Sequence, residues 1–377
     1  MSEGFVITSA TDANDLLNQI VGQAVARGWV QQHLSGLGGI GRRAHISKDG
    51  LVVNLASAPS QPPVLNGDTQ ARATMNAIIP QADRRNQDWN WWYSTYNQNV
   101  GYFYQSPGYL AISAGTGYDG GLAWYSQPGS DYDSEANKNY GNFNIAKTDG
   151  AIGKVWMFFF ENPVGLVIIW EARPGQFMWM AAGNLEKDYD FQGGQYYGAS
   201  FSMVNPTGSY SAALGVCQVR IADSQVKTNR ANGWGGSYVT YPDFNTYPDD
   251  RNVPQVPGYS TYIYTSNANN PNQMAVGEPQ RSYDDTTGRV WLHPARAYGV
   301  RTDIGHSYLG VVGDVYYTTT RAFVGGETID LGGEQYMVFP FNARVSPYNW
   351  DVDNMANDAG WYTRNNFGAG MAIRKPQ

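Results

Sequence analysis

Charged residues are scarce in this chain. Asp, Glu, Lys and Arg make up 15% of the 377 residues, whereas an average globular protein contains about 25%. The 25 Lys and Arg residues are outnumbered by 32 Asp and Glu residues, which gives a net charge of −7, and the basic residues form no run. Nucleic-acid binding requires clustered Lys and Arg that neutralise phosphates, so we expect no direct nucleic-acid partner.

Few residues are available for disulfides or metal binding. Cys217 is the only cysteine, which excludes an intrachain disulfide and a cysteine-rich zinc site. The four histidines, His33, His45, His293 and His306, do not follow the spacing of metal ligands. The sequence therefore predicts no metal site.

A long apolar run is also missing. The most apolar region, residues 155–170, is interrupted by Glu161, Asn162 and Pro163, and it is shorter than the roughly 18–20 apolar residues that cross a bilayer. The first residues lack the basic start and the apolar core of a signal peptide. We therefore expect no membrane span, no signal peptide and synthesis in the cytoplasm.

Two patterns that resemble functional motifs have simpler interpretations. Residues 36–41 have the glycine spacing of a dinucleotide-binding loop, but such a loop follows a strand and opens a helix. Here the predicted order is reversed, with a helix before the glycines and a strand after them. Asp131, Asp133 and Glu135 alternate as in a calcium loop, without its glycine at the sixth position. We predict no cofactor, and no catalytic motif is present.

One segment has the periodicity of a helix. Apolar residues recur at helical spacing between Leu16 and Val25 after a polar start, which predicts a helix from about Ala13 to Arg27. Gly28 suits a left-handed residue at the C-terminal end. Trp29 follows directly, and we expect it to pack the helix onto the body of the protein.

Most of the remaining chain has the short apolar runs of β-strands. Residues 155–160 and 166–171 are apolar except for Glu171 at the end and predict a hairpin that is buried on both faces. Residues 242–259 and 266–273 are rich in Pro, Asp and Asn and predict long loops. Further strands are predicted at residues 51–55, 109–112, 289–292, 307–318, 322–324 and 335–341.

These patterns together define a fold class. The protein is predicted to be mainly β, with a β-sandwich or barrel-like body, one N-terminal helix and long loops. The predicted organisation is an N-terminal helix and strand segment (1–60), a central β body (61–240), a loop-rich arm (241–285) and C-terminal strands that complete the body (286–377).

Aromatic residues are abundant, with 12 Trp, 27 Tyr and 14 Phe. Trp89, Trp91, Trp92, Tyr93 and Tyr96 form a local cluster in which rings alternate with polar residues. Such a cluster is typical of a platform on which sugars stack, and also of a β-core or a subunit interface. Packing or protein contact is the favoured interpretation, and carbohydrate binding is the alternative.

The run from Trp170 to Lys187 contains several turn-forming residues. Pro174 with Gly175 and Gly193 with Gly194 are turn dipeptides, and Asn184 after Gly183 suggests a left-handed residue. We predict that these six residues, Pro174, Gly175, Gly183, Asn184, Gly193 and Gly194, form structural turns.

This run, continued through residues 193–196, resembles the central strands of a group of structural proteins from the virions of tailed bacteriophages. Other short segments, spread along the chain, are similar to the same group. They are residues 26–29, 50–55, 117–124, 127–129, 333–340 and 366–375.

The resemblance implies a non-enzymatic structural subunit of a bacteriophage virion, in the tail, neck, collar or baseplate. Its partners would be copies of itself and other virion proteins. The ratio of 18 Arg to 7 Lys and the many aromatics fit large protein interfaces. One alternative is a tail module that binds a carbohydrate or host receptor, with a host-surface glycan on the aromatic cluster. Another is a polysaccharide-degrading enzyme, with a carboxylate pair drawn from Asp119, Asp131 and Glu171.

Overall fold

The computed structural model describes part of the chain. The described residues are 3–36, 41–58, 108–122, 127–129, 144–148, 150–173, 176–188, 190, 194–199, 201–202, 220–222, 237–239, 283–284, 289–290, 292–301, 305–319, 323–340 and 369–376. The predicted loops 242–259 and 266–273 lie outside them.

One helix and many strands make up the described elements. The first half of the chain contains β1 (Gly4–Ala10), α1 (Ala13–Val25), β2 (Val30–Gly36), β3 (Arg42–Lys48), β4 (Leu51–Ala58), β5 (Gly108–Gly115), β6 (Asn144–Thr148), β7 (Ile152–Glu161), β8 (Val164–Arg173) and β9 (Gln176–Lys187). The second half contains β10 (Gln195–Ala199), β11 (Phe201–Ser202), β12 (Arg220–Ala222), β13 (Ser237–Val239), β14 (Tyr283–Asp284), β15 (Arg289–Val290), β16 (His293–Arg301), β17 (Gly305–Thr319), β18 (Glu327–Leu331), β19 (Glu334–Pro340) and β20 (Ala369–Arg374).

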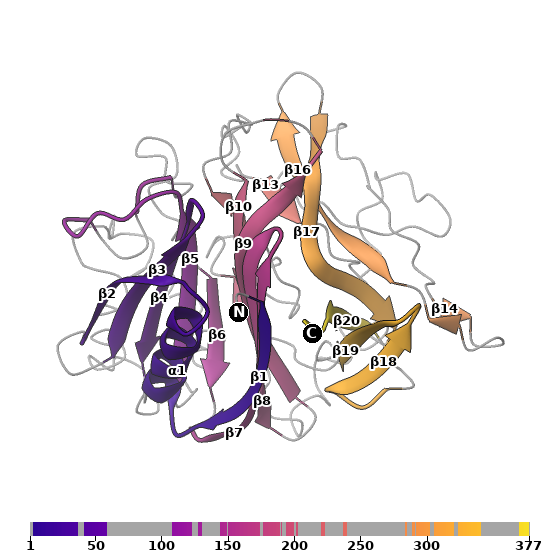
Figure 1. Cartoon of the computed structure of the whole chain (residues 1–377), viewed down its shortest axis with the longest axis horizontal. Helices are drawn as coiled ribbons and strands as arrows, with labels where there is room; N and C mark the ends of the chain where they lie inside the picture. Colours follow the sequence, from indigo (N-terminus) through magenta and orange to yellow (C-terminus); the bar gives the residue numbers. More distant parts are fainter. Residues whose placement is uncertain are drawn as a thin grey trace, which may run out of the picture.

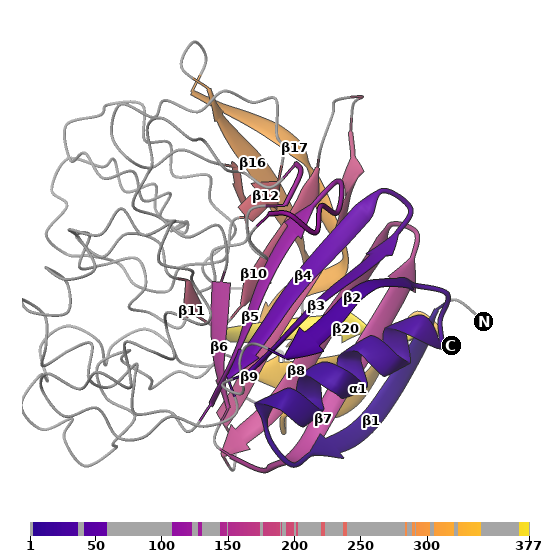
Figure 2. The same cartoon turned by 90° about the vertical axis from the view of Figure 1, so that its left-hand side faces the viewer.

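Most strands form one large curled sheet and one smaller sheet, as Figures 1 and 2 show, and β14 and β15 pair only with each other among the described strands. The large sheet has the order β1-β7-β8-β9-β10-β12-β13-β16-β17-β20-β19-β18, and the smaller one has the order β11-β6-β5-β4-β3-β2. An additional pairing of β9 with β17 closes β9, β10, β12, β13, β16 and β17 into a ring. The predicted mainly β fold with a barrel-like body and one N-terminal helix is therefore confirmed.

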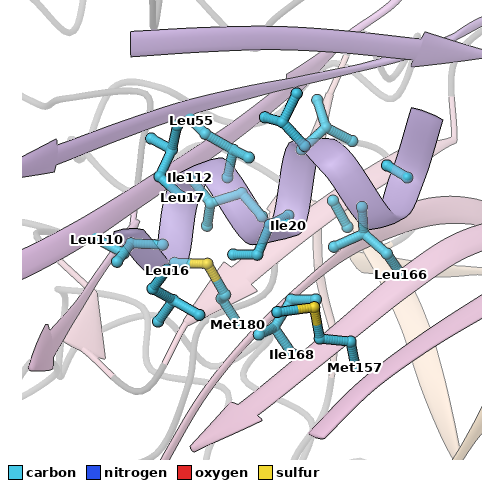
Figure 3. Close-up of a cluster of buried hydrophobic side chains, with 14 of the residues drawn as sticks. Leu16, Leu17, Ile20, Leu55, Leu110, Ile112, Met157, Leu166, Ile168 and Met180 are labelled. Carbon is cyan, nitrogen blue, oxygen red and sulfur yellow. The ribbon is translucent and has the colours of Figure 1, made fainter. Parts of the chain in front are cut away.

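The helix forms as predicted and is capped at both ends. Asp12 accepts a hydrogen bond from the backbone N–H of Asp15 at 2.9 Å, which satisfies one of the free N–H groups of the first turn. Gly28 has φ +80°, and Trp29 is only 3% exposed. The apolar face of α1 packs into the space between the two sheets (Figure 3), against residues such as Leu55, Leu110, Ile112, Met157, Leu166, Ile168 and Met180.

The hairpin of β7 and β8 is buried on both faces, which confirms that prediction. Met157 and Phe159 point toward α1 and the smaller sheet. Trp156 and Phe158 point to the opposite face, where they meet Phe339 of β19 at ring-centroid distances of 5.1 Å and 6.3 Å. A second core therefore fills the curl of the large sheet.

Two local predictions are wrong. Phe323 and Val324 of the predicted strand 322–324 are not in a strand, since they precede a turn and β18 begins only at Glu327; Ala322 lies outside the described residues. In this turn Gly326 has φ +84°, and a β-carbon there would lie 2.7 Å from the Trp156 ring. The glycine-rich residues 36–41 follow strand β2 and not a helix, and β2 pairs with β3 after them. No helix follows these glycines, so the pattern still differs from a dinucleotide-binding loop.

The predicted turn residues have different outcomes. Gly183 and Asn184 lie inside β9 without a positive φ, so the prediction of a turn there is wrong; the space at Gly183 is occupied by the ring of Tyr196. Gly194 has φ +90°, as a turn requires. Pro174, Gly175 and Gly193 lie outside the described residues, and β8 and β9 pair on either side of the first two.

Candidate functional site

The predicted aromatic cluster cannot be placed. Trp89, Trp91, Trp92, Tyr93 and Tyr96 all lie outside the described residues. Asp131 of the carboxylate set also lies outside them, whereas Asp119 follows β5 and Glu171 belongs to β8. The structure instead brings together residues that sequence reasoning had set aside.

His33 and His45 are neighbours across two paired strands. They face each other in the register of β2 and β3, and their ring centroids are 6.0 Å apart. The sequence analysis missed this pair because the two residues are twelve positions apart and β2 was not predicted. A signal was available, since strands on both sides of residues 36–41 would form a hairpin with the histidines opposite each other.

Arg43 and Ser35 extend this pair along the same face. They are also opposite each other in the register. Arg43 Nε lies 3.2 Å from both His33 Nε2 and Ser35 Oγ, and His33 Nε2 lies 2.8 Å from Ser35 Oγ. His33 Nε2 therefore accepts the Arg43 N–H, and the hydrogen of His33 is placed on Nδ1.

His45 is the buried member of the pair. It is 2% exposed, and its Nδ1 donates a hydrogen bond of 2.7 Å to Asn54 Oδ1 on β4. Burial, with smaller contributions from the nearby His33 and Arg43, lowers the pKa of His45 to about 4 against the opposing effect of the hydrogen bond to Asn54. Burial and Arg43 also lower the pKa of His33 from its usual value. Both imidazoles are therefore neutral at pH 7.

Tyr118 covers the histidines from the loop after β5. Its ring centroid lies 4.8 Å from that of His45 and 6.3 Å from that of His33. The loop is held in place by Gln127, whose side chain accepts from the N–H of Asp119 at 2.7 Å and donates to its carbonyl at 3.1 Å. Residues 117–122 and 127–129, which belong to segments that carry part of the phage resemblance, thus position Tyr118.

A row of polar side chains continues from the histidines across the smaller sheet. His33, His45, Asn54 and Ser113 are successive register partners on β2, β3, β4 and β5. This row lies on the face away from α1, because the alternate residues belong to the core beneath the helix. Asn54 and Ser113 are completely buried, and Asn54 Nδ2 and Ser113 Oγ have no hydrogen-bond partner.

The described part of the chain contains no group of three or more His, Cys, Asp or Glu residues that could hold a metal ion. It also contains no helix long and apolar enough to cross a membrane. No protein-family model matches the chain, and no curated protein matches it significantly.

Proposed function

We propose that this chain is a non-enzymatic structural subunit of a tailed-bacteriophage virion, located in the tail, neck, collar or baseplate. It acts through contacts with copies of itself and with other virion proteins. The observation that carries the proposal is the edge strand β1, whose outer side is left unpaired by the described strands. The resemblance of several segments to phage structural proteins supplies the identity of the assembly.

β1 has the properties of an edge that accepts another strand. It pairs with β7 on one side only, and residues 4–10 contain no charged residue and no proline. Ile7 is 52% exposed in the middle of the strand. Natural proteins usually protect sheet edges with charges, proline or bulges. β1 has one register shift, between Thr8 and Ala10, and its regular part from Gly4 to Thr8, which is uncharged and carries the exposed isoleucine, suits pairing with a neighbouring chain.

The opposite edge of the same sheet is protected. β18 pairs only with β19, and its exposed residues include Glu327 and Asp330. Like charges at an edge oppose the approach of another strand of similar charge. The two edges therefore differ, and β1 is the one suited to assembly.

The segments that carry the resemblance support a scaffolding role. The run from Trp170 to Lys187 forms the end of β8 and all of β9, and β9 is paired with β8, β10 and β17. Residues 334–340 form β19, which covers the second core. These segments belong to the large sheet whose edge is β1.

An edge substitution tests the proposal. Ile7→Lys places a charge on β1, and we expect it to convert oligomers of the purified protein into monomers without lowering the melting temperature. Val25→Lys is the matched control, because Val25 is also exposed (44%) but lies on α1. Oligomer mass is measured by light scattering, and a map of the intact particle would show where the chain lies.

Two outcomes would contradict the proposal. One is a wild-type protein that stays monomeric and has no place in the particle map. The other is release of fragments from host polysaccharide, which would contradict the non-enzymatic role. The carbohydrate-binding alternative depends on residues 89–96, which lie outside the described residues, and it stays a prediction.

A further inference from the structure

We infer that Arg43, together with His33 and Tyr118, forms a binding site for an oxyanion, either a carboxylate or a phosphate group. The site lies on the face of the smaller sheet that points away from α1. This inference does not depend on the proposed role in a virion.

Arg43 is a cation without a carboxylate partner. Its contacts are through Nε, to His33 and Ser35, and its two terminal amino groups have no acceptor among the described residues. By contrast, Lys48 pairs with Glu161, and Arg374 pairs with Asp314. Guanidinium groups bind carboxylates and phosphates through two parallel N–H bonds, and the terminal amino groups of Arg43 are available for such a contact.

The surrounding side chains offer donors and few acceptors. His33 Nε2 and Asn54 Oδ1 are already occupied as acceptors. Within the described part of the chain, two partly exposed donors lack a partner, the Tyr118 hydroxyl and the His33 Nδ1–H. The fully buried Asn54 Nδ2 and Ser113 hydroxyl also lack one, which is uncommon in folded proteins, but they have no exposed surface and cannot meet an anion from solvent. The contacts available to an anion are therefore those of Arg43, His33 and Tyr118.

The local charge favours an anion. Arg43 lowers the pKa values of both His33 and His45, and no carboxylate of the described residues is among the causes that shift them. Since both imidazoles are neutral at pH 7, Arg43 is the only charge of the cluster, and nothing in it repels an anion. A bound oxyanion would in turn raise the pKa of His33, because an opposite charge stabilises the imidazolium.

The neighbouring arginine provides a matched control. Arg42 precedes Arg43 in β3, so its side chain projects from the other face of the sheet. There its Nη1 donates a hydrogen bond of 2.8 Å to Asn18 Oδ1 of α1. Arg42→Gln and Arg43→Gln remove the same charge from adjacent positions, and only the second removes it from the proposed site.

The experiment titrates the full chain with inorganic phosphate and, separately, with glucuronate. Binding is measured by calorimetry and by the NMR signals of the histidine rings. We expect at least one anion to bind and to shift the signals of His33 and His45. Arg43→Gln should weaken binding by about tenfold or more, since it removes a charge-assisted bidentate contact. Tighter binding of phosphate or of glucuronate identifies which oxyanion the site takes.

The inference is overturned if neither anion binds the wild-type protein, or if Arg42→Gln and Arg43→Gln weaken binding equally. Equal weakening would mean that net charge, and not this site, attracts the anion. Arg43→Lys serves as a second variant if Arg43→Gln fails to fold. Arg43→Lys keeps the positive charge and loses the planar pair of N–H donors. The inference therefore requires this variant also to bind the anion more weakly than the wild type does.

Discussion

The ring of Tyr196 occupies the space above Gly183, its partner on the neighbouring strand β9. A β-carbon at Gly183 would lie 2.6 Å from the Tyr196 hydroxyl. Gly165, opposite Gly183 on β8, leaves room for the same hydroxyl, 3.2 Å from its own β-carbon position. Tyr196 is 2% exposed, and burial, with a contribution from Asp314, raises the pKa of its phenol. Two glycines on adjacent strands thus leave the space that one buried aromatic side chain fills.

Gly183→Ala is expected to destabilise the protein. The added methyl group has no room beside the Tyr196 ring, and overpacking of this kind costs about 1–3 kcal/mol. The free energy of unfolding is measured by urea denaturation. Gly153→Ala is the control, because Gly153 also lies in a strand and has no atom within 4 Å of its β-carbon position. Equal stability of the two variants would contradict the role assigned to Tyr196.

Arg374 links the two ends of the described chain. It forms an ion pair with Asp314 through Nε, a second contact of 3.1 Å from Nη2, and a longer pair of 3.8 Å with Glu3. Figure 2 shows the N- and C-terminal ends side by side at the start of β1. Asp314, at φ +63°, has a side chain that is only 11% exposed.

Removal of the Arg374 side chain leaves Asp314 without its cation. Arg374→Met should lower the free energy of unfolding by about 1–3 kcal/mol, less than for a fully buried pair because Arg374 is partly exposed. Lys375→Met is the control, since Lys375 makes an exposed contact with Gln335 and lies 5.5 Å from the centre of the Phe5 ring. If Lys375→Met lowers the free energy of unfolding as much as Arg374→Met does, the positive charge near the C-terminus, and not the contact with Asp314, determines the stability.

His45 makes stability depend on pH. Its pKa is about 4 in the folded protein and about 6.5 in an unfolded chain. Between these values the unfolded state binds more protons, so stability rises with pH through this window and is lost as the pH falls. The loss approaches about 3 kcal/mol below pH 4. Urea denaturation at pH 7, 5.5 and 4.5 measures it.

His45→Gln separates this effect from the titration of the carboxylates. It keeps a side chain that can donate to Asn54 and has no charge at any of these pH values. We expect the variant to be less stable than the wild type at pH 7 and to lose less stability as the pH falls. If the free energy of unfolding changes with pH equally in the variant and the wild type, His45 is not the cause of the pH dependence of stability.

Elements with local causes were predicted well from the sequence. The helix follows from its apolar spacing, from Asp12 at its start and from Gly28 at its end. The hairpin of β7 and β8 follows from two apolar runs around Pro163. In each case the residues that determine the structure are neighbours in the chain, so propensity and periodicity carry the information.

The residues of the candidate site were not predicted, because their relations span separate strands. His33 meets His45 only through the register of β2 and β3, and Tyr118 reaches them only through a loop held by Gln127. Gly183 looked like a turn glycine because the sequence does not show that Tyr196 packs on it. Sequence by itself determined the mainly β class, the single helix and the sparse charge. The tertiary structure decided which polar groups share a face of the sheet and which glycines have an aromatic ring packed on them. Strand register and side-chain packing depend on contacts between residues that are distant in the sequence.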